Sequence, residues 1–383
     1  MLKTKKSMPR IVVIGGGATG CGVARDLVLR GYQTTLIESG NLGSGTSSRS
    51  HGMLQSGARY AVTETSFAAE CYSERNIISK IFPQAVQLIG GLFISLPNDP
   101  EDYPEKFLKG CKIAKIPTKE ININEVLKRE KELSKNILRA FHVPDAVIYP
   151  TKLFYLLAKE IKAYGGKILT NHQVVSIKKI NNIASSVVVS HNEIKTSIEC
   201  DGIINAAGPW SGKIAKLINQ NVELQLTRGC GIFFTGKLIN KAINRCRVPN
   251  NNDIMCPSGK ESLWGTTSEV VLDPESPKTS LDEIKELLQG AEEIFPNIRN
   301  YKSFRTWSGV RPLVKTQNIN KNLPLSRRHL VIDHEETGIK NFLSVCGGAL
   351  TTHRLMAEDV VNKLGNKFDI NIRCSSHKTP LLN

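Results

Sequence analysis

The sequence predicts an α/β fold in which a mostly parallel sheet is interrupted by segments of a second, antiparallel-sheet domain. Two observations support this prediction. Residues 11–38 form one β-α-β unit with a glycine-rich turn. The same rhythm returns after residue 150, and alternating strand patterns with charged helical stretches separate its parts. The chain of 383 residues is long enough for two domains with their own cores.

The first unit begins with the apolar run of residues 11–14, which is typical of a buried parallel strand. A helix is expected over 19–29 and a second strand over 34–38. The loop of residues 40–57 is long for a connection within a compact domain, which favours a functional role. A helix is then expected over 65–82.

The remaining elements alternate between the two domains. Between residues 83 and 150 we expect a strand at 91–96 and exposed helices within 119–134. The α/β rhythm resumes with a helix at 153–164 and strands at 167–170, 174–177 and 202–205. Strands at 230–235 and 263–267 and a helix at 281–295 indicate the second domain again. A strand at 342–348, a helix at 350–364 and a loose tail at 375–383 close the chain.

These elements define the expected domain bounds. The first domain comprises 8–82, 150–212 and 330–366, the second comprises 83–149 and 213–329, and residues 367–383 form a tail. We expect the first domain to be Rossmann-like and the second to carry the antiparallel sheet.

The glycine-rich turn predicts a dinucleotide site. Gly15 permits the tight turn, Gly17 lets the backbone approach a pyrophosphate, and Gly20 lets the helix pack closely. The helix that starts near Ala18 and Thr19 offers N–H groups and a partial positive charge to the phosphates. Glu38 ends the second strand, where a carboxylate accepts ribose hydroxyls and disfavours NADP. The alternative is a glycine-rich turn beside a solvated glutamate.

Four further clusters carry candidate site residues. The loop containing Thr46, Ser47, Arg49 and His51 suits a pyrophosphate and a ring edge, although a hydroxylated surface loop is the alternative. Small residues end the strand at 202–205, which permits close backbone approach to a ligand. The third cluster places the cation of Arg311 beside a proline turn. The fourth cluster is a glycine turn that enters a helix. Their candidate residues are Ala207, Gly208, Arg311, Gly347, Gly348, Ala349, Leu350 and Thr351.

In this order and spacing the clusters resemble the FAD-dependent glycerol-3-phosphate dehydrogenases, and most closely the large catalytic subunit of the anaerobic enzyme. The similarity runs from Ile11 to about Gly365. Its specific motifs are Gly16-Gly17-Ala18-Thr19-Gly20, Ser56-Gly57-Ala58-Arg59-Tyr60, Gly91-Leu92-Phe93-Ile94, Val143-Pro144-Asp145, Asn244-Arg245-Cys246-Arg247, Gly265-Thr266-Thr267-Ser268, Ser308-Gly309-Val310-Arg311-Pro312-Leu313 and Arg354-Leu355-Met356-Ala357-Glu358.

The resemblance implies a Rossmann-like FAD-binding domain interleaved with a substrate domain, as in the glutathione-reductase-2 or D-amino-acid-oxidase type. It implies oxidation of sn-glycerol 3-phosphate to dihydroxyacetone phosphate by hydride transfer from C2 to flavin N5. Arg311 and Arg354 are expected to hold the substrate, with Arg59 as a weaker third candidate. By resemblance, Val174 meets the adenine and the 347–351 turn meets the pyrimidine end of the flavin.

Three departures from the family pattern bear on the chemistry. Family members usually have a histidine where Gln55 stands and a lysine where Ala349 stands, so His51 is a candidate base. The catalytic subunit of the anaerobic enzyme usually continues into a cysteine-rich cluster domain, whereas this sequence ends at Asn383, and Cys374 alone cannot hold an iron–sulfur cluster. Electrons are therefore expected to leave FAD for a quinone, partner subunits or oxygen.

Two alternatives remain open. The first is a related FAD oxidoreductase that acts on a 2-hydroxy acid, an amino acid or an amine, because arginines bind carboxylates as readily as phosphates. The second is an FAD-binding subunit that has lost its own substrate chemistry, which the residues at Gln55 and Ala349 motivate.

Composition bounds the partners and the compartment. The net charge of +16 suits an anionic substrate or an acidic lipid surface, while dispersed basic residues and few aromatics argue against nucleic acid. No secretory leader and no membrane-spanning apolar stretch is evident, so we expect a cytoplasmic protein, with peripheral contact at the inner face of the cell membrane as an option. Nine scattered cysteines without a C-x-x-C pair predict no disulfide framework and no metal site.

Overall fold

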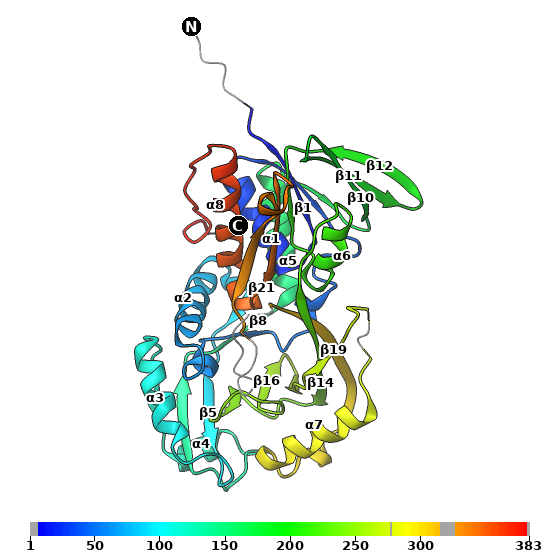
Figure 1. Cartoon of the computed structure of the whole chain (residues 1–383). Coiled ribbons are helices and arrows are strands. Elements are labelled where there is room, and N and C mark those ends of the chain that lie inside the picture. The colour runs from blue at the N-terminus through cyan, green and yellow to red at the C-terminus, as the bar shows by residue number, and fades with distance from the viewer. Residues whose placement is uncertain (1–6, 276–277, 315–325, 381–383) are drawn as a thin grey trace. The chain divides into compact units, whose positions relative to one another are not determined.

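The computed structural model describes residues 7–275, 278–314 and 326–380 (Figure 1). The chain divides into two compact units. The first unit comprises Met1–Ser47, Thr151–Leu224 and Arg328–Asn383, and the second comprises Ser48–Pro150 and Gln225–Arg327. Relative to the expected domains, residues 48–82 fall in the second unit and 213–224 in the first. The cofactor and substrate roles of the two domains remain predictions.

A six-stranded sheet of order β20-β21-β13-β1-β2-β9 organises the first unit. Five strands run parallel, and the edge strand β20 is antiparallel. The apolar runs on β1, β13 and β21 are buried, as is typical of parallel strands that are covered on both faces. The strands are β1 Arg10–Ile14, β2 Gln33–Ile37, β9 Lys167–Leu169, β13 Gly202–Asn205, β20 His329–Asp333 and β21 Phe342–Gly347. The predicted α/β class with a mostly parallel sheet is confirmed.

Within the described residues of this unit, four helices accompany the sheet. Helix α1 (Ala18–Leu29) follows the glycine turn and packs against α8 (His353–Lys367), beside the parallel strands in Figure 1. The other two are α5 (Pro150–Ala163) and the short α6 (Ser211–Lys216).

A separate antiparallel sheet also belongs to the first unit. Its strands are β10 (Gln173–Ile180), β11 (Ile183–His191) and β12 (Ile194–Glu199). The prediction that residues 174–177 belong to the α/β rhythm was therefore wrong. Two-residue turns connect the strands, and both residues of each turn have positive φ, as Asn181 (φ 50°) and Asn182 (φ 61°) show. Asparagine tolerates this left-handed conformation, so the turns favour hairpins over a βαβ crossover.

The loose tail expected over residues 375–383 is wrong for the residues that the structure describes. Residues 375–380 are held against the first unit. The buried Arg25 donates to the backbone oxygen of Ser376 at 2.9 Å and of Thr379 at 2.8 Å. Residues 381–383 of the tail lie outside the described part of the chain.

A nine-stranded sheet forms the second unit, in the order β18-β14-β17-β16-β15-β5-β7-β6 with β19 paired to β14. Most neighbouring strands are antiparallel, although β15 and β5 run parallel. The strands are β5 Gly91–Ser95, β6 Lys119–Glu120, β7 Arg139–Val143, β14 Leu224–Thr235, β15 Ala242–Arg245, β16 Ile254–Ser258, β17 Glu261–Gly265, β18 Glu269–Val270 and β19 Ser303–Val314. The predicted antiparallel character is confirmed, apart from the parallel pair β15 and β5.

Helices cover both faces of this sheet, since alternate residues of β5 belong to different cores. Leu92 and Ile94 pack in the core of Trp264 and Phe295 with α7 (Leu281–Ile294). Phe93 stacks on Phe107 of α3 with ring centroids 4.7 Å apart. The other helices of this unit are α2 Thr65–Ile81, α3 Tyr103–Ile113 and α4 Ile123–Arg129, and a small sheet joins β3 Met53–Leu54, β8 Ala146–Ile148 and β4 Val86–Gln87.

Two details of the second unit differ from expectation. Pro312 lies inside the twelve-residue strand β19, so Arg311 projects from a strand and not from a proline turn. The helical stretch expected over 119–134 shortens to α4, while α3 was missed because its apolar positions are interrupted by lysines. Among the described residues, no helix combines the length and apolar character needed to cross a bilayer.

Candidate functional site

The glycine turn of the first unit has the backbone geometry that its sequence predicts. Gly15 has φ 106°, and its N–H donates to the Ile37 oxygen at 2.8 Å. A Cβ on Gly20 would lie 1.8 Å from the Gly15 oxygen, so any side chain there would separate α1 from the turn. A Cβ on Gly17 would meet only the Ser47 Oγ, at 3.1 Å. The start of α1 therefore offers backbone room and N–H groups to a pyrophosphate, which fits a bound dinucleotide.

Glu38 and Ser47 hold this turn in shape. The Glu38 carboxylate accepts N–H bonds from Gly16 at 2.7 Å and Gly40 at 2.8 Å. The oxygen that accepts from Gly40 also accepts the Ser39 hydroxyl at 3.1 Å, so it is the oxygen bonded to Gly16 that keeps a second lone pair with which to accept a ribose hydroxyl. The Ser47 Oγ accepts the Ala18 N–H at 2.9 Å, so its own hydroxyl hydrogen can point onward to a phosphate. Thr46 lies in the same short 3₁₀ turn, Thr46–Ser48.

The other expected cofactor residues of the first unit lie at the ends of its strands. Ala207 and Gly208 directly follow β13, and a Cβ on Gly208 (φ 55°) would meet nothing within 4 Å. Val174 is 8% exposed and belongs to the apolar core beneath β10. Gly208 thus leaves room for a ligand after strand β13, at the C-terminal edge of the parallel sheet, where ligands of open α/β sheets bind. Val174 packs in the core and shows no such space.

The turn of residues 347–351 is built from two consecutive left-handed glycines, Gly347 (φ 78°) and Gly348 (φ 72°). The Ala349 N–H donates to Thr352 Oγ1 at 3.1 Å, and the 3₁₀ turn Leu350–Thr352 leads into α8. Thr351 is buried while Leu350 is partly exposed. The predicted glycine turn that enters a helix is confirmed.

Arg354 lies in a buried network with the tail. Its Nη1 donates to Glu358 Oε2 at 2.6 Å and to Ser376 Oγ at 3.2 Å, and the side chain is 6% exposed. This geometry favours a role for Arg354 in anchoring the tail to α8. Its expected role in substrate binding gains no support from these contacts.

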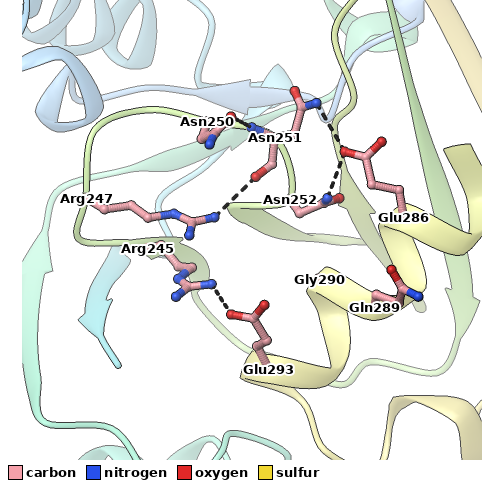
Figure 2. A pocket seen from close by; sticks show the side chains of 9 residues that line it. All are labelled: Arg245, Arg247, Asn250, Asn251, Asn252, Glu286, Gln289, Gly290 and Glu293. Carbon is pink, nitrogen blue, oxygen red and sulfur yellow. Dashed lines mark hydrogen bonds and ion pairs between the residues drawn. The ribbon is translucent and has the colours of Figure 1, made fainter. Parts of the chain in front are cut away.

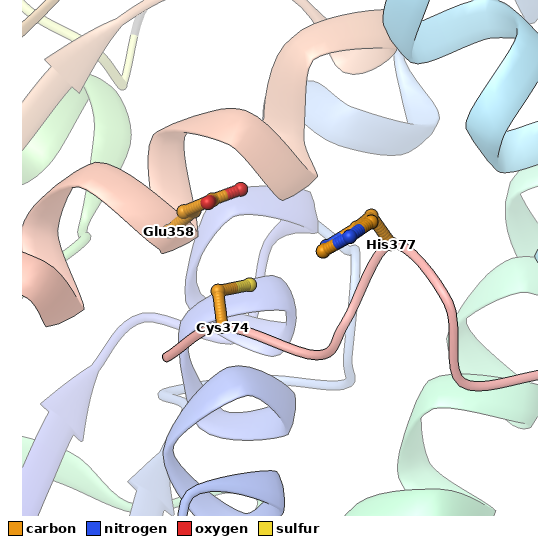
Figure 3. Close-up of side chains that lie close together, drawn as sticks. All are labelled: Glu358, Cys374 and His377. Carbon is orange, nitrogen blue, oxygen red and sulfur yellow. The ribbon is translucent and has the colours of Figure 1, made fainter. Parts of the chain in front are cut away.

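Figure 3 shows Glu358 on α8 with Cys374 and His377 on the tail, and their ligand atoms lie within 4.8 Å of one another. Such a group can hold a metal ion. However, Arg354 already pairs with Glu358, and the Cys374 thiol donates to Asp26 Oδ1 at 3.0 Å. Burial, followed by the charge of Asp26, raises the pKa of Cys374 to about 11, so the thiol stays protonated at neutral pH. These partners favour a hydrogen-bonded cluster over a metal centre.

His51 in the second unit has an electrostatic environment set by arginines. Burial, and then the positive charges of Arg311, Arg59 and Arg327, lower the pKa of His51 to about 3. The imidazole stands edge-on to the Trp307 ring with centroids 6.2 Å apart. His51 is therefore neutral at physiological pH, inside a cationic cluster.

Arg311 is a half-buried member of that cluster. Its guanidinium donates to Thr266 Oγ1 at 2.7 Å and to the Thr267 oxygen at 3.2 Å. A Cβ on Gly229 would lie 2.0 Å from Arg311 Nη2, so β14 needs glycine where the guanidinium passes. Burial and the charge of Arg327 lower the pKa of Arg311 to about 9, which leaves it protonated at neutral pH.

Sequence reasoning missed Arg327. It follows the undescribed residues 315–325, and no motif marked it. Its charge acts on both His51 and Arg311, which places it in the same cluster. The signal that would have found it is the arginine pair at 327–328 just before strand β20. Of the expected residues, Arg49 is exposed, and its Cβ lies 2.8 Å from where a Cβ on Gly309 would be.

Trp307 Nε1 and Ser308 Oγ are buried side-chain atoms without a hydrogen-bond partner among the described residues. The Trp307 ring stands beside His51, but its Nε1 faces strand β14, where a Cβ on Gly231 would lie 2.7 Å away. The two side chains follow each other in strand β19 and therefore point to opposite faces of the sheet. These atoms add no evidence for a ligand at His51.

Hydrogen bonds join two motifs of the sequence, at Ser56 and at Asp145. The Ser56 N–H and Oγ–H both donate to Asp145 Oδ1 at 2.7 Å. Burial raises the pKa of the Asp145 carboxyl. The contact fixes the segment that carries Gln55 and Arg59 to the strand pair that ends at Asp145.

A polar pocket of about 280 Å³ lies between α7 and the loop after β15 (Figure 2). Asn251 and Asn252 both donate to Glu286 Oε1 at 3.2 Å, and Arg247 reaches the Asn251 oxygen at 3.4 Å. Opposite charges line it side by side, so its walls are largely paired with one another.

Comparisons with known proteins agree with this geometry. The profile of the FAD dependent oxidoreductase family matches residues 10–362. The A1 subunit of the anaerobic glycerol-3-phosphate dehydrogenase of Haloferax volcanii is 33% identical over 98% of this chain and 67% of its own length. The corresponding subunit of the anaerobic enzyme of Escherichia coli K12 is 34% identical over 95% of this chain and 69% of its own.

Solved structures show the same fold. The glycerol-3-phosphate dehydrogenase of Bacillus halodurans, complexed with FAD, matches with a TM-score of 0.76 and 23% identity over 98% of this chain and 68% of that one. Glycine oxidase from Bacillus cereus matches with a TM-score of 0.71 and 20% identity over 94% of this chain and 95% of that one. Enzymes that act on phosphates and on amino acids thus share this architecture.

Proposed function

The chain belongs to the family of FAD-dependent oxidoreductases, and we propose that it oxidises sn-glycerol 3-phosphate to dihydroxyacetone phosphate. The observation that carries this proposal is the cluster of Arg59, Arg311 and Arg327 around His51. A phosphate dianion needs several cationic donors, and guanidinium groups bind its oxygens in pairs. The similarity to the Haloferax volcanii and Escherichia coli subunits of the anaerobic enzyme supports the same substrate.

The first unit supplies the proposed cofactor residues. Gly15, Gly17 and Gly20 would form the pyrophosphate cradle with the N–H groups of Ala18 and Thr19, and Ser47 would add a hydroxyl. Glu38 would accept the ribose hydroxyls, and the 347–351 turn would direct N–H groups at the flavin. When bound, FAD supplies the two-electron acceptor for the hydride from C2.

His51 is the proposed base. Oxidation of an alcohol requires removal of the hydroxyl proton, and His51 is neutral and able to accept one. In the free protein the three arginines make it a very weak base. A bound phosphate dianion offsets their charge, so we expect the pKa of His51 to rise towards its ordinary value when substrate binds. The substrate thus activates its own base, which is consistent with the replacement of the usual histidine by Gln55.

Electrons are proposed to leave the protein for a quinone or a partner subunit. The relatives from Haloferax volcanii and Escherichia coli are named as subunits, which supports an assembly. The net charge of +16 is compatible with an acidic partner surface or membrane headgroups.

Anaerobic reduction of the bound flavin tests the proposal. The purified holoprotein is mixed with sn-glycerol 3-phosphate, and bleaching of the visible flavin bands is expected. Bleaching only by glycine, sarcosine or 2-hydroxyglutarate would assign the related carboxylate or amine chemistry instead. No bleaching by any of them in folded, flavin-loaded protein would indicate a protein without substrate chemistry of its own.

A matched pair of arginine variants sharpens the test. Arg311→Gln removes the enclosed cation and should abolish bleaching by glycerol 3-phosphate. Arg305→Gln, in the same strand β19, removes an exposed arginine that pairs with Glu261 and should bleach as the wild type does. Equal behaviour of the two variants would remove Arg311 from the proposed site.

A further inference from the structure

We infer that Asp253 is a positioning residue for the arginine cluster, and that it acts through Arg59. This inference rests on the proposed function for the role of Arg59. Asp253 is fully buried, and its Oδ2 accepts a hydrogen bond from Arg59 Nη2 at 3.0 Å. Arg59 Nη2 also donates to the Asn250 oxygen at 2.8 Å. Both acceptors belong to one loop, residues 250–253, so this loop sets where the guanidinium of Arg59 lies.

Asp253 also shapes the loop itself. Its Oδ2 accepts the Asn250 N–H at 2.7 Å, which closes the loop into a tight turn. Its Oδ1 accepts the Arg247 Nε–H at 2.9 Å, so the same carboxylate joins two arginines. A single carboxylate that binds two guanidiniums and a backbone donor has few alternative positions, and it therefore fixes Arg59 with little freedom.

The 250–253 loop reaches the second enclosed arginine as well. The Asn252 N–H donates to the Thr266 oxygen at 3.3 Å, and the Thr266 hydroxyl accepts from Arg311 at 2.7 Å. One loop thus supports Arg59 directly and Arg311 through one residue. Neither Asp253 nor Asn252 belongs to a motif that the sequence marked for function.

On its other side the loop is held by α7 at the pocket of Figure 2. The amides of Asn251 and Asn252 converge on Glu286. A Cβ on Gly290 would lie 2.4 Å from the Asn252 Cβ, so α7 needs glycine there for the loop to approach. The paired polar groups of this pocket therefore hold the 250–253 loop against α7, and the loop in turn holds Arg59.

The central test is a double-mutant cycle between Arg59→Ala and Asp253→Asn. If Asp253 acts by positioning Arg59, Asp253→Asn raises KM for glycerol 3-phosphate about tenfold and changes kcat much less, because Arg59 binds the non-reacting phosphate. The double variant should then resemble Arg59→Ala alone. Multiplying effects in the double variant would show that Asp253 does not act through Arg59 and would overturn the inference.

Glu130→Gln is the matched control. Glu130 is also a buried carboxylate of the second unit and accepts the Asn240 N–H at 2.9 Å, yet within the described part of the chain it makes no direct contact with Arg59 or with residues 250–253. Its replacement should lower the melting temperature and leave KM unchanged. If both variants lower the melting temperature with unchanged KM, Asp253 is merely structural and the inference fails. Should Asp253→Asn not fold, Glu286→Gln loosens the same loop from its exposed side and should raise KM about two- to threefold.

A binding measurement separates this inference from the proposed function. The affinity of the FAD-loaded protein for inorganic phosphate is measured by calorimetry at constant ionic strength for the wild type, the two single variants and the double variant. Loss of affinity in both single variants, without further loss in the double variant, supports the inference even if glycerol 3-phosphate does not bleach the flavin. Phosphate affinity that is independent of Asp253, or no phosphate binding by the wild type, overturns it.

Discussion

At the scale of single residues, the close packing of Gly20 makes cofactor binding sensitive to one methyl group. In Gly20→Ala the new Cβ would lie 1.8 Å from the Gly15 oxygen, so α1 must move away from the turn. We expect the FAD content, measured from flavin absorbance per protein after gel filtration, to fall at least about tenfold, because the helix N-terminus no longer aligns with the phosphates.

Gly31→Ala is the control at the other end of α1. Gly31 has φ 84°, but a Cβ there would meet nothing within 4 Å. It should cost about 1 kcal/mol of stability and keep FAD. Equal FAD contents in the two variants would contradict the proposed cradle.

The same glycine turn shows that the roles of some single residues could be predicted from the sequence. The roles of Gly15 and Gly20 follow from spacing alone, and the close approaches of both glycines agree with it. Arg354 shows the opposite case. Its arginine–leucine motif pointed to the substrate, but its partners Glu358 and Ser376 lie one turn along the helix and in the distant tail. Long-range partners of a charged side chain cannot be read from local sequence.

The low pKa of His51 predicts a pH-dependent stability. In the unfolded chain a histidine has a pKa of about 6.5, whereas burial and the three arginines lower the pKa of His51 to about 3. Between these values the unfolded state binds one proton more than the folded state, so His51 makes the protein less stable as the pH falls from about 6.5 towards about 3.

His51→Gln removes this contribution. Its free energy of unfolding, measured with urea, should fall less steeply over that acidic range than that of the wild type, by at most about 1.4 kcal/mol per pH unit. Parallel stability curves for the two proteins would show that His51 is not held neutral.

At the scale of secondary structure, strands and helices were predictable where the local pattern was strong. The first β-α-β unit, α2, α5, α7 and the final helix lie close to their expected bounds. Strand β19 was missed because Gly309 and Pro312 are residues typical of turns. In the structure this segment is extended and pairs with β14. Tertiary pairing overrides such local signals.

The tail was expected to be loose over residues 375–383, and the order of its described residues 375–380 comes from hydrogen bonds to buried charges. The side chains of Arg25 and Asp26 lie beneath it. Truncation after Arg373 would leave the Arg25 guanidinium, which also pairs with Glu160, short of two acceptors. We predict a loss of about 2–5 kcal/mol in the free energy of unfolding, since a buried charge without its partners is strongly destabilising.

Truncation after Pro380 is the matched control, because it keeps both acceptors of Arg25. Urea unfolding of the two shortened proteins should give a midpoint near that of the full chain for the longer one and a clearly lower midpoint for the shorter one. Equal midpoints would mean that residues 374–380 do not stabilise the first unit.

At the scale of the whole molecule, the sequence identified the fold class and the cofactor but only part of the arginine cluster. Arg59 and Arg311 were found by motif, whereas Arg327 and Asp253 are recognised only through their neighbours. The cluster assembles residues from sequence positions between 51 and 327 of one unit. Such a set becomes visible only when the strands that carry it are placed side by side.

The net charge of +16 predicts how the molecule meets an anionic substrate. At about 0.01 M salt a positive field attracts a phosphate dianion over about 30 Å, and added salt shortens that range to about 8 Å at physiological ionic strength. The apparent second-order rate constant of flavin reduction by glycerol 3-phosphate should therefore fall severalfold between low and high salt. The limiting rate at saturating substrate should change little, because the enclosed contacts of Arg311 are screened much less than the surface field.

Stopped-flow reduction under anaerobic conditions measures both quantities, and choline chloride in place of sodium chloride separates ionic strength from specific ion effects. Arg305→Gln removes one exposed charge outside the cluster and should keep nearly the whole salt dependence. Arg59→Ala should lower the rate constant at every salt concentration, because it removes a contact as well as a charge. A rate constant that does not respond to salt would mean that the positive surface serves another partner, with acidic lipid or an acidic protein as the remaining candidates.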